Sequence, residues 1–403
     1  MAPQVFDDIP RSDSHWQRDP ESSWEFLNRV DGDYWDYVRQ IIEAWFAWMS
    51  ASGSKQFLGR LRSGDDSQFR SAFLELYVHE TLRRAGWSVE VEPALNGTGT
   101  RPDFLARRGQ QRVIIEVTAR GTPREVARRA HRRGHVWQAI DDVIVGDVGF
   151  RLVELTVGPQ DLRLKELKDQ LTFWANEVVN SPVDPGPFMH CRQGWVIHLE
   201  AVRNVRVPGA PGKSRGIALG AIDASFPTHD ETLRSLIAKK DCRYGEMGLP
   251  YVICVGANMI ETDDWFGVQT FYGRHQVTLA TDESGEEVFV PAPLTNHGYF
   301  VDHVSPRRTH VSGVWVADNI SSSGPHVARN TMWVNPNAAH ALEDPTLGGP
   351  LRVARCVGQE IRFSETQIEA ANFLELDEQW LGARPWSSGE PWRAPNQPLR
   401  YPS

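Results

Sequence analysis

Two acidic residues in consecutive apolar segments are the side chains of this sequence best placed to do chemistry. Asp103 follows Pro102, and Glu116 comes thirteen residues later within the run Ile114-Ile115-Glu116-Val117. A turn at Arg108-Gly109 would fold the two segments into paired antiparallel strands, which brings such positions close together. Carboxylate oxygens are preferred ligands of Mg²⁺, which also keeps waters and binds phosphate. The pattern therefore predicts a divalent-ion site that can act on a phosphate group.

A third carboxylate, Glu75, lies in a segment predicted to be a helix over residues 68–85. Apolar residues cover two sides of this segment, as expected for a helix packed between layers. Gly86 follows in a position suited to ending the helix. Glu75 is therefore expected where water is scarce.

Each carboxylate taken singly has a simpler explanation. Acidic residues at strand ends are usually solvated or paired with arginine, and Arg101 and Arg120 are close in sequence to the two strand carboxylates. The combination of a helix glutamate, a glycine, Pro-Asp and an apolar run ending in glutamate is what indicates a site.

Positive charge is concentrated beside these residues although the chain has a net charge of -9. Ten arginines lie between residues 101 and 135. Four of them are expected to contact phosphate, namely Arg101, Arg120, Arg124 and Arg128. The alternative is that arginine is simply the usual base of this chain, which has six lysines.

Helical and strand patterns alternate along the chain, which predicts a layered α/β or α+β fold. Helices are expected over residues 33–50, 68–85, 124–145, 162–179 and 228–240. Strands are expected over 87–93, 102–107, 111–118, 150–157, 194–202, 250–255, 311–317 and 332–334. We expect a helical cap over 1–60, a central domain over 61–180, and an α/β extension over 181–403 with a Trp- and Pro-rich tail.

The central segment resembles a known superfamily. Glu75, Leu82 and Gly86, followed by Arg101-Pro102-Asp103-Phe104 and Ile115-Glu116-Val117-Thr118, look like the PD-(D/E)XK nucleases, the fold of many restriction endonucleases. The resemblance covers 68–157 in the order helix, three strands, helix, strand, which is the core of that superfamily. Later in the chain, Arg243-Tyr244-Gly245-Glu246 runs into Leu249-Pro250-Tyr251-Val252, and Asn335-Pro336 follows. With these motifs, the rest of the chain looks like a family of large, uncharacterised bacterial proteins with this core.

The resemblance implies that Asp103 and Glu116 bind Mg²⁺ or Mn²⁺ and that Glu75 supports the ion directly or through water. It also matches Gln138 to a polar residue that often faces the scissile phosphate, although an exposed helix glutamine explains it equally. One feature departs from the family. In that family, a lysine two residues after the glutamate positions and activates water and stabilises the developing charge. The residue at this position here is Thr118. Arg120 or Arg124 would have to replace its charge, although arginine accepts protons poorly.

The resulting expectation is metal-dependent hydrolysis of phosphodiester bonds in nucleic acid, with DNA as the expected substrate, in genome defence or repair. The alternative is an inactive nuclease fold that binds nucleic acid or serves as a scaffold. A small-molecule enzyme in the second half has no residue constellation behind it. The sequence shows neither a secretory signal nor a membrane-length apolar run, and its four cysteines are scattered, so we expect a cytoplasmic protein without a membrane partner.

Overall fold

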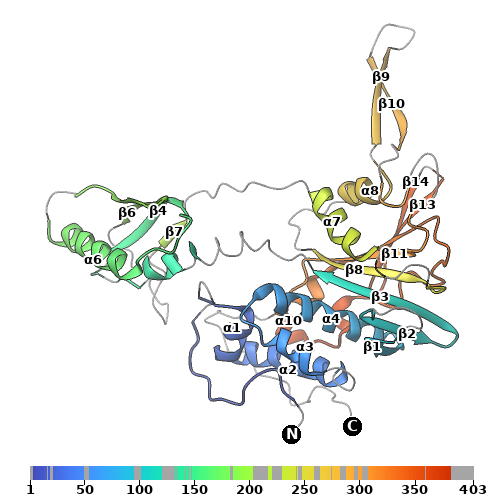
Figure 1. Cartoon of the computed structure of the whole chain (residues 1–403), viewed down its shortest axis with the longest axis horizontal. Helices are drawn as coiled ribbons and strands as arrows, with labels where there is room; N and C mark the ends of the chain where they lie inside the picture. Colours follow the sequence, from blue (N-terminus) through green and yellow to red (C-terminus); the bar gives the residue numbers. More distant parts are fainter. Residues whose placement is uncertain are drawn as a thin grey trace. The chain divides into compact units, whose positions relative to one another are not determined.

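The computed structural model describes residues 3–382 except 16, 19–20, 50–53, 95–100, 120–131, 134, 141, 144, 147, 182–184, 203–216, 220–228, 242, 244–246, 258–263, 274, 282–286, 295–297, 302–306 and 359. The chain divides into two compact units. The large unit contains residues 1–12, 27–120 and 226–403, and the small unit contains 13–26 and 121–225. The fold is mixed α/β (Figure 1).

An eight-stranded mixed sheet forms the centre of the large unit. Its strand order is β1-β2-β3-β8-β11-β12-β13-β14. The bounds are β1 Ser88–Val91, β2 Phe104–Arg108, β3 Gln111–Ala119, β8 Tyr251–Ala257, β11 Gly313–Asp318, β12 Arg329–Val334, β13 Arg352–Val357 and β14 Glu360–Ser364. β2 pairs antiparallel with both β1 and β3, whereas β3 and β8 run parallel, as do β8 and β11.

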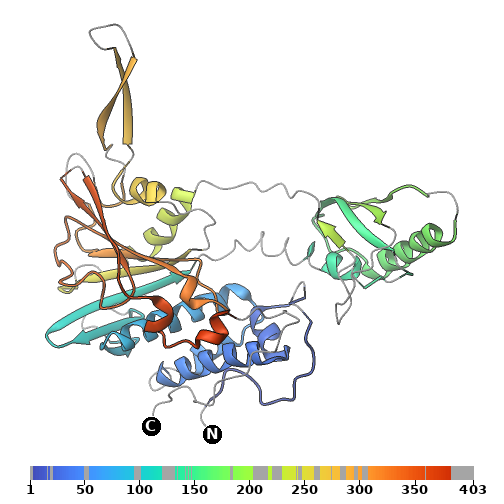
Figure 2. The same cartoon turned by 180° about the vertical axis from the view of Figure 1, so that it is seen from behind.

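Helices pack against this sheet from two sides (Figure 1). The helices of the N-terminal part are α2 Asp33–Met49, α3 Ser54–Leu61 and α4 Asp66–Arg84; those near β8 are α7 His229–Asp241 and α8 Asp264–Phe271. Shorter elements are α1 Ser23–Arg29, the 3₁₀ turn η1 Pro325–Val327, α9 Ala370–Phe373 and α10 Glu378–Gly382. A separate pair of strands, β9 His275–Thr281 and β10 Glu287–Leu294, is joined antiparallel (Figure 2).

Helix α4 carries the upstream carboxylate and forms as its sequence predicts. The Asp65 side chain accepts a hydrogen bond from the Ser67 N–H and caps the first turn. Gly86 follows the helix with φ +82°, a conformation that favours glycine. Residues on both sides of the helix are buried, because α4 lies between α2 and α3 on one side and the sheet on the other.

The small unit has its own sheet and core. Its strands, in the order β5-β6-β4-β7, are β4 Gly149–Thr156, β5 Phe188–Arg192, β6 Trp195–Val202 and β7 Ile217–Leu219. Helix α6, Leu164–Asn180, contributes to the same apolar core. Residues 132–133 and 135–140 are helical, whereas the start of the helix expected over 124–145 lies outside the described residues.

One expectation about the core is wrong. The strand over 150–157 was assigned to the sheet of the two carboxylates, but β4 belongs to the small unit, and β8 pairs with β3 instead. The burial patterns give the reason. β4 is exposed along much of its length, which suits a sheet with one open face, whereas every residue of β8 is buried, as a parallel interior strand requires.

Candidate active site

The pairing of β2 with β3 brings the two strand carboxylates together. Phe104 pairs with Ile115, so Asp103 lies opposite Glu116. The Asp103 N–H donates a hydrogen bond of 3.3 Å to Glu116 Oε2, and the Val117 N–H donates one of 2.6 Å to Asp103 Oδ2. Each carboxylate thus accepts a hydrogen bond from the backbone of the other segment.

Glu116 points toward α7. On β3, Ile114 packs in one apolar cluster with Leu233 and Ile237 of α7. Side chains two residues apart on a strand share a face, so Glu116 lies on that side as well. Its side chain is completely buried.

Two cations near the end of α7 neutralise this buried carboxylate. The Lys240 ammonium forms a short salt bridge with Glu116 Oε1. Arg243 donates from Nη1 to the same oxygen at 2.8 Å. Charge-assisted hydrogen bonds of this kind offset the cost of burying an ionised group.

Lys240 is the residue that the sequence reasoning missed. The sequence predicts that Arg120 or Arg124, close to Thr118, replaces the charge of the missing lysine. Both arginines lie outside the described residues. A lysine that contacts Glu116 comes from 124 residues later in the chain. The sequence did contain one indication of Lys240, because this residue ends the helix predicted over 228–240, just before the apolar strand that corresponds to β8.

Glu75 is buried and forms a bidentate salt bridge with one arginine. Both of its oxygens accept from Arg60 of α3, at 2.5 Å from Nη1 and 2.7 Å from Nη2. Burial raises the pKa of Glu75, the Arg60 and Lys240 charges oppose this rise, and the Glu116 charge adds to it. Glu75 therefore lies within electrostatic range of the strand carboxylates while its own oxygens face Arg60.

Asp103 is partly buried and lies within electrostatic range of two other carboxylates. Burial, followed by the charges of Glu116 and Glu75, raises the pKa of Asp103 to about 7, although Lys240 and the Val117 N–H favour its ionised form. A carboxyl group with such neighbours is stabilised when a cation joins it.

The donor set that a divalent ion could use here consists of two carboxylates, Asp103 and Glu116. No group of three His, Cys, Asp or Glu side chains among the described residues is arranged to hold a metal ion. An ion at this pair would take oxygens from Asp103 and Glu116 in competition with Lys240 and Arg243, and waters or substrate oxygens would complete its coordination, as is common for Mg²⁺.

The other predicted residues have separate environments. Thr118 is on β3 and half-buried, and Arg101 is exposed. Gln138 belongs to the small unit, where its amide donates to Asp142 Oδ1 at 2.8 Å. Arg128 lies outside the described residues.

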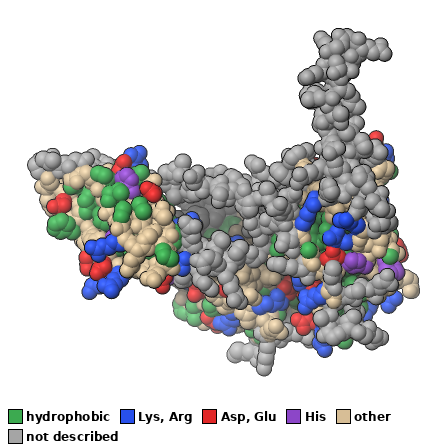
Figure 3. Space-filling view, turned by 45° about the horizontal axis from the view of Figure 1, so that its top comes forward, with side chains coloured by type: hydrophobic (Ala, Val, Ile, Leu, Met, Phe, Trp, Pro, Cys, Tyr) green, Lys and Arg blue, Asp and Glu red, His purple; other side chains and the backbone are tan. Residues whose placement is uncertain are grey.

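The arginine-rich stretch is partly structural. Arg107 pairs with Glu90 at 2.8 Å, and Arg108 pairs with Asp344 at 2.9 Å while stacking on Trp87. On the face of the large unit seen in Figure 3, acidic and basic side chains are interspersed. The described part of the stretch thus contributes intramolecular ion pairs as well as exposed positive charge.

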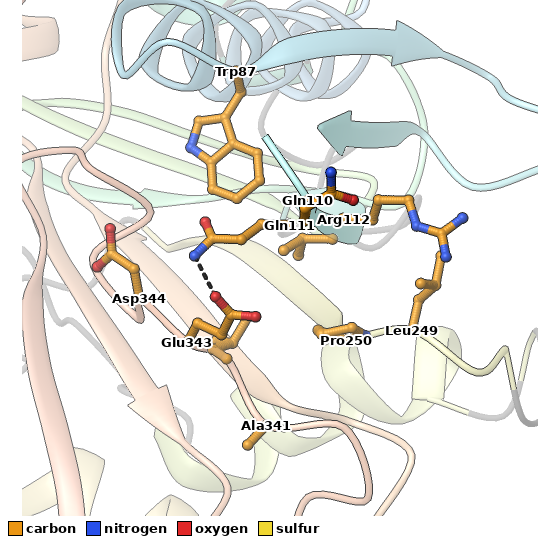
Figure 4. Close-up of a pocket in the computed structure, with 11 residues that line it drawn as sticks. Trp87, Gln110, Gln111, Arg112, Leu249, Pro250, Ala341, Glu343 and Asp344 are labelled. Atoms are coloured by element: carbon orange, nitrogen blue, oxygen red, sulfur yellow. Dashed lines mark hydrogen bonds between the residues drawn. The ribbon is translucent and has the colours of Figure 1, made fainter. Parts of the chain in front are cut away.

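A cavity of about 160 Å³ lies at the other end of β3, near the β2–β3 turn. Trp87, Arg112 and Leu249 line it, and the Gln111 amide donates across it to Glu343 Oε2 at 2.6 Å (Figure 4). Glu116 is four positions after Arg112 along the strand, a length of about 13 Å. This cavity is therefore distinct from the carboxylate site.

The chain matches no protein-family model, no curated protein and no solved structure among those with which it was compared. No helix in the described parts of the chain has the length and hydrophobicity that a membrane crossing requires. Assignment of function therefore relies on the chemistry of the site itself.

Proposed function

We propose that this protein is a metal-dependent nuclease that hydrolyses phosphodiester bonds in nucleic acid, with DNA as the expected substrate. The observation that carries the proposal is the contact of Lys240 with Glu116, beside Asp103. Lys240 thus places an ammonium group beside the carboxylate pair. The local motif lacks such a group, because its lysine position is occupied by Thr118.

The order of elements around the site supports the same proposal. Helix α4, strands β1, β2 and β3, helix α7 and strand β8 follow one another as helix, three strands, helix and strand. Residues 121–225 of the small unit come between β3 and α7 in sequence. With that insertion set aside, the order is the one that the PD-(D/E)XK resemblance implies, and Lys240 belongs to its second helix.

Each residue has a chemical role in this proposal. Asp103 and Glu116 would hold Mg²⁺ or Mn²⁺, and such an ion polarises a phosphoryl oxygen and lowers the pKa of a bound water. The Lys240 ammonium has three N–H donors, of which one is directed at Glu116. The others can stabilise charge that develops on the phosphoryl oxygens, and Arg243 can add a second cation.

A cleavage assay tests this assignment. Supercoiled plasmid and labelled oligonucleotides are incubated with the parent protein in Mg²⁺, Mn²⁺ or EDTA. We expect cleavage with either ion, none in EDTA, and a loss of roughly 100-fold or more for Glu116→Gln and Lys240→Met, by analogy with removal of single transition-state donors. Lys168→Met is the matched control, because Lys168 forms an exposed pair with Asp142 in the small unit.

The assay also separates the competing function. A nucleic-acid-binding protein without turnover would retain DNA in a salt-dependent way that requires no metal. If the parent protein binds DNA but no metal supports cleavage, that function replaces the one proposed. Equal activity of Glu116→Gln and the parent would mean that any cleavage arises elsewhere.

A further inference from the structure

Arg60 is a cation held rigidly at the edge of the proposed site. Its two terminal nitrogens form a bidentate pair with buried Glu75. Its guanidinium also lies 5.1 Å from the ring centroid of Phe57, which is buried and stacks on Phe46. A bidentate pair and an aromatic contact together restrict the guanidinium to one orientation.

Part of this guanidinium is available to a ligand. An arginine has five N–H donors, and the pair with Glu75 uses one on each terminal nitrogen. The remaining three have no hydrogen-bond acceptor among the described residues, and 28% of the side chain is exposed. Planar N–H donors in a fixed orientation are well suited to phosphate oxygens.

Arg60 is connected to the proposed site through Glu75, because α3 packs on α4, and α4 packs on β3, the strand that carries Glu116. Burial opposes the charged form, but Glu75, then Asp103 and Glu92, raise the pKa of Arg60 above its usual value. Arg60 therefore stays protonated and lies within electrostatic range of Asp103.

We propose that Arg60 binds a phosphate of the nucleic-acid substrate next to Asp103, and that Glu75 is a positioning residue for Arg60 rather than a ligand of the metal ion. The inference rests on the proposed nuclease function and assigns a substrate contact that the sequence motif does not contain. It also changes the role of Glu75, whose two oxygens both accept from the Arg60 guanidinium.

The test uses a charge-neutral double variant. Arg60→Gln alone leaves Glu75 buried without its partner, which is strongly destabilising. Arg60→Gln/Glu75→Gln removes both charges and leaves the local net charge unchanged. Arg60→Lys retains the charge without the planar fork, and Arg70→Gln is the control, because Arg70 is an exposed residue of α4 with only a 3.7 Å pair to Asp66. Thermal unfolding confirms that each variant is folded.

Three measurements are made on the full chain: Mn²⁺ affinity by calorimetry, binding of a labelled DNA duplex in EDTA by fluorescence anisotropy at several salt concentrations, and cleavage with Mn²⁺. We expect the double variant to bind Mn²⁺ within about threefold of the parent, because the ligands are unchanged. Its salt dependence of DNA binding should lose about one phosphate contact. Its cleavage rate should fall roughly 10- to 100-fold, and Arg60→Lys should recover part of that loss.

Two outcomes overturn the inference while the nuclease assignment stands. A fall of tenfold or more in Mn²⁺ affinity for the double variant would make Glu75 an ion ligand. DNA binding and cleavage equal to those of Arg70→Gln would remove Arg60 from the substrate contact. If the parent neither binds nor cleaves nucleic acid, the proposed function itself fails and the role of Arg60 fails with it. If the parent binds without cleaving, the salt dependence alone decides the role of Arg60.

Discussion

Replacing Asp103 with asparagine should stabilise the metal-free protein, and more so as pH rises. The folded protein raises the pKa of this carboxyl from 3.8 to about 7, chiefly through burial and then through the charges of Glu116 and Glu75. Ionised Asp103 is thus less favourable in the folded than in the unfolded protein. Asparagine keeps an oxygen that can accept the Val117 N–H and cannot ionise.

The size of the effect follows from the two pKa values. A group whose pKa is raised on folding contributes its full stability below the unfolded value and loses it as pH rises through the folded value. With 3.8 unfolded and about 7 folded, the loss approaches about 4 kcal/mol at pH 8, at about 1.4 kcal/mol per pKa unit. By the same relation roughly 2 kcal/mol is already lost at pH 5. The stability gained by the variant should therefore grow by about 2–3 kcal/mol between pH 5 and pH 8.

Hydrogen exchange of the β3 peptide in EDTA, followed with increasing urea, measures this quantity for the large unit by itself. Asp344→Asn is a control of opposite sign. Burial opposes ionisation of Asp344, but the hydrogen bonds from Thr346 and Arg108 outweigh it and lower its pKa. Its stabilising contribution is present above the unfolded pKa and lost as pH falls. Asp344→Asn should therefore destabilise the protein most at high pH.

A parallel pH dependence of the parent and Asp103→Asn between pH 5 and pH 8 would refute the reasoning. It would mean that Asp103 ionises normally, and hence that it is neither buried nor close enough to Glu116 to share an ion with it. A variant less stable than the parent at pH 8 would lead to the same conclusion.

Three further outcomes are expected. Mg²⁺ should stabilise the parent by about 2.7 kcal/mol at one hundred times its dissociation constant but leave Asp103→Asn almost unchanged, measured by the same exchange experiment. Lys240→Met should bind Mn²⁺ at least as tightly as the parent in calorimetry, because a competing cation is removed from Glu116, while its cleavage rate falls. Gly267→Ala should destabilise the large unit by roughly 1–3 kcal/mol in urea unfolding, because the added methyl group would overlap the Trp333 ring; unchanged stability would show that the ring can move.

The local parts of the site were predictable from sequence, since they depend on neighbouring segments. Asp103 and Glu116 lie on strands joined by a short turn, so their pairing follows from the motif. The burial of Glu75 follows from apolar residues on two sides of α4. The same is true of Gly86, whose positive φ ends that helix.

Contacts between distant segments could not be obtained in this way. Lys240 reaches Glu116 only because β8 pairs with β3 and α7 packs on both strands. Arg60 lies in α3, Ser54–Leu61, a segment for which the sequence predicts no helix. The strand over 150–157 was included in the core with the two carboxylates, although β4 belongs to the small unit, because strand periodicity predicts a strand but not the sheet to which it belongs.

The distance in sequence between the two halves of the site has a consequence for the newly made chain. Glu116 and Lys240 are 124 residues apart. At the usual pace of translation, about 5–20 residues per second, roughly 6–25 s pass between the synthesis of the two residues. Throughout that interval the emerging polypeptide has its acidic pair but no ammonium group to complement it. If the proposed chemistry holds, the ribosome-bound protein cannot damage nucleic acid until α7 has emerged and docked.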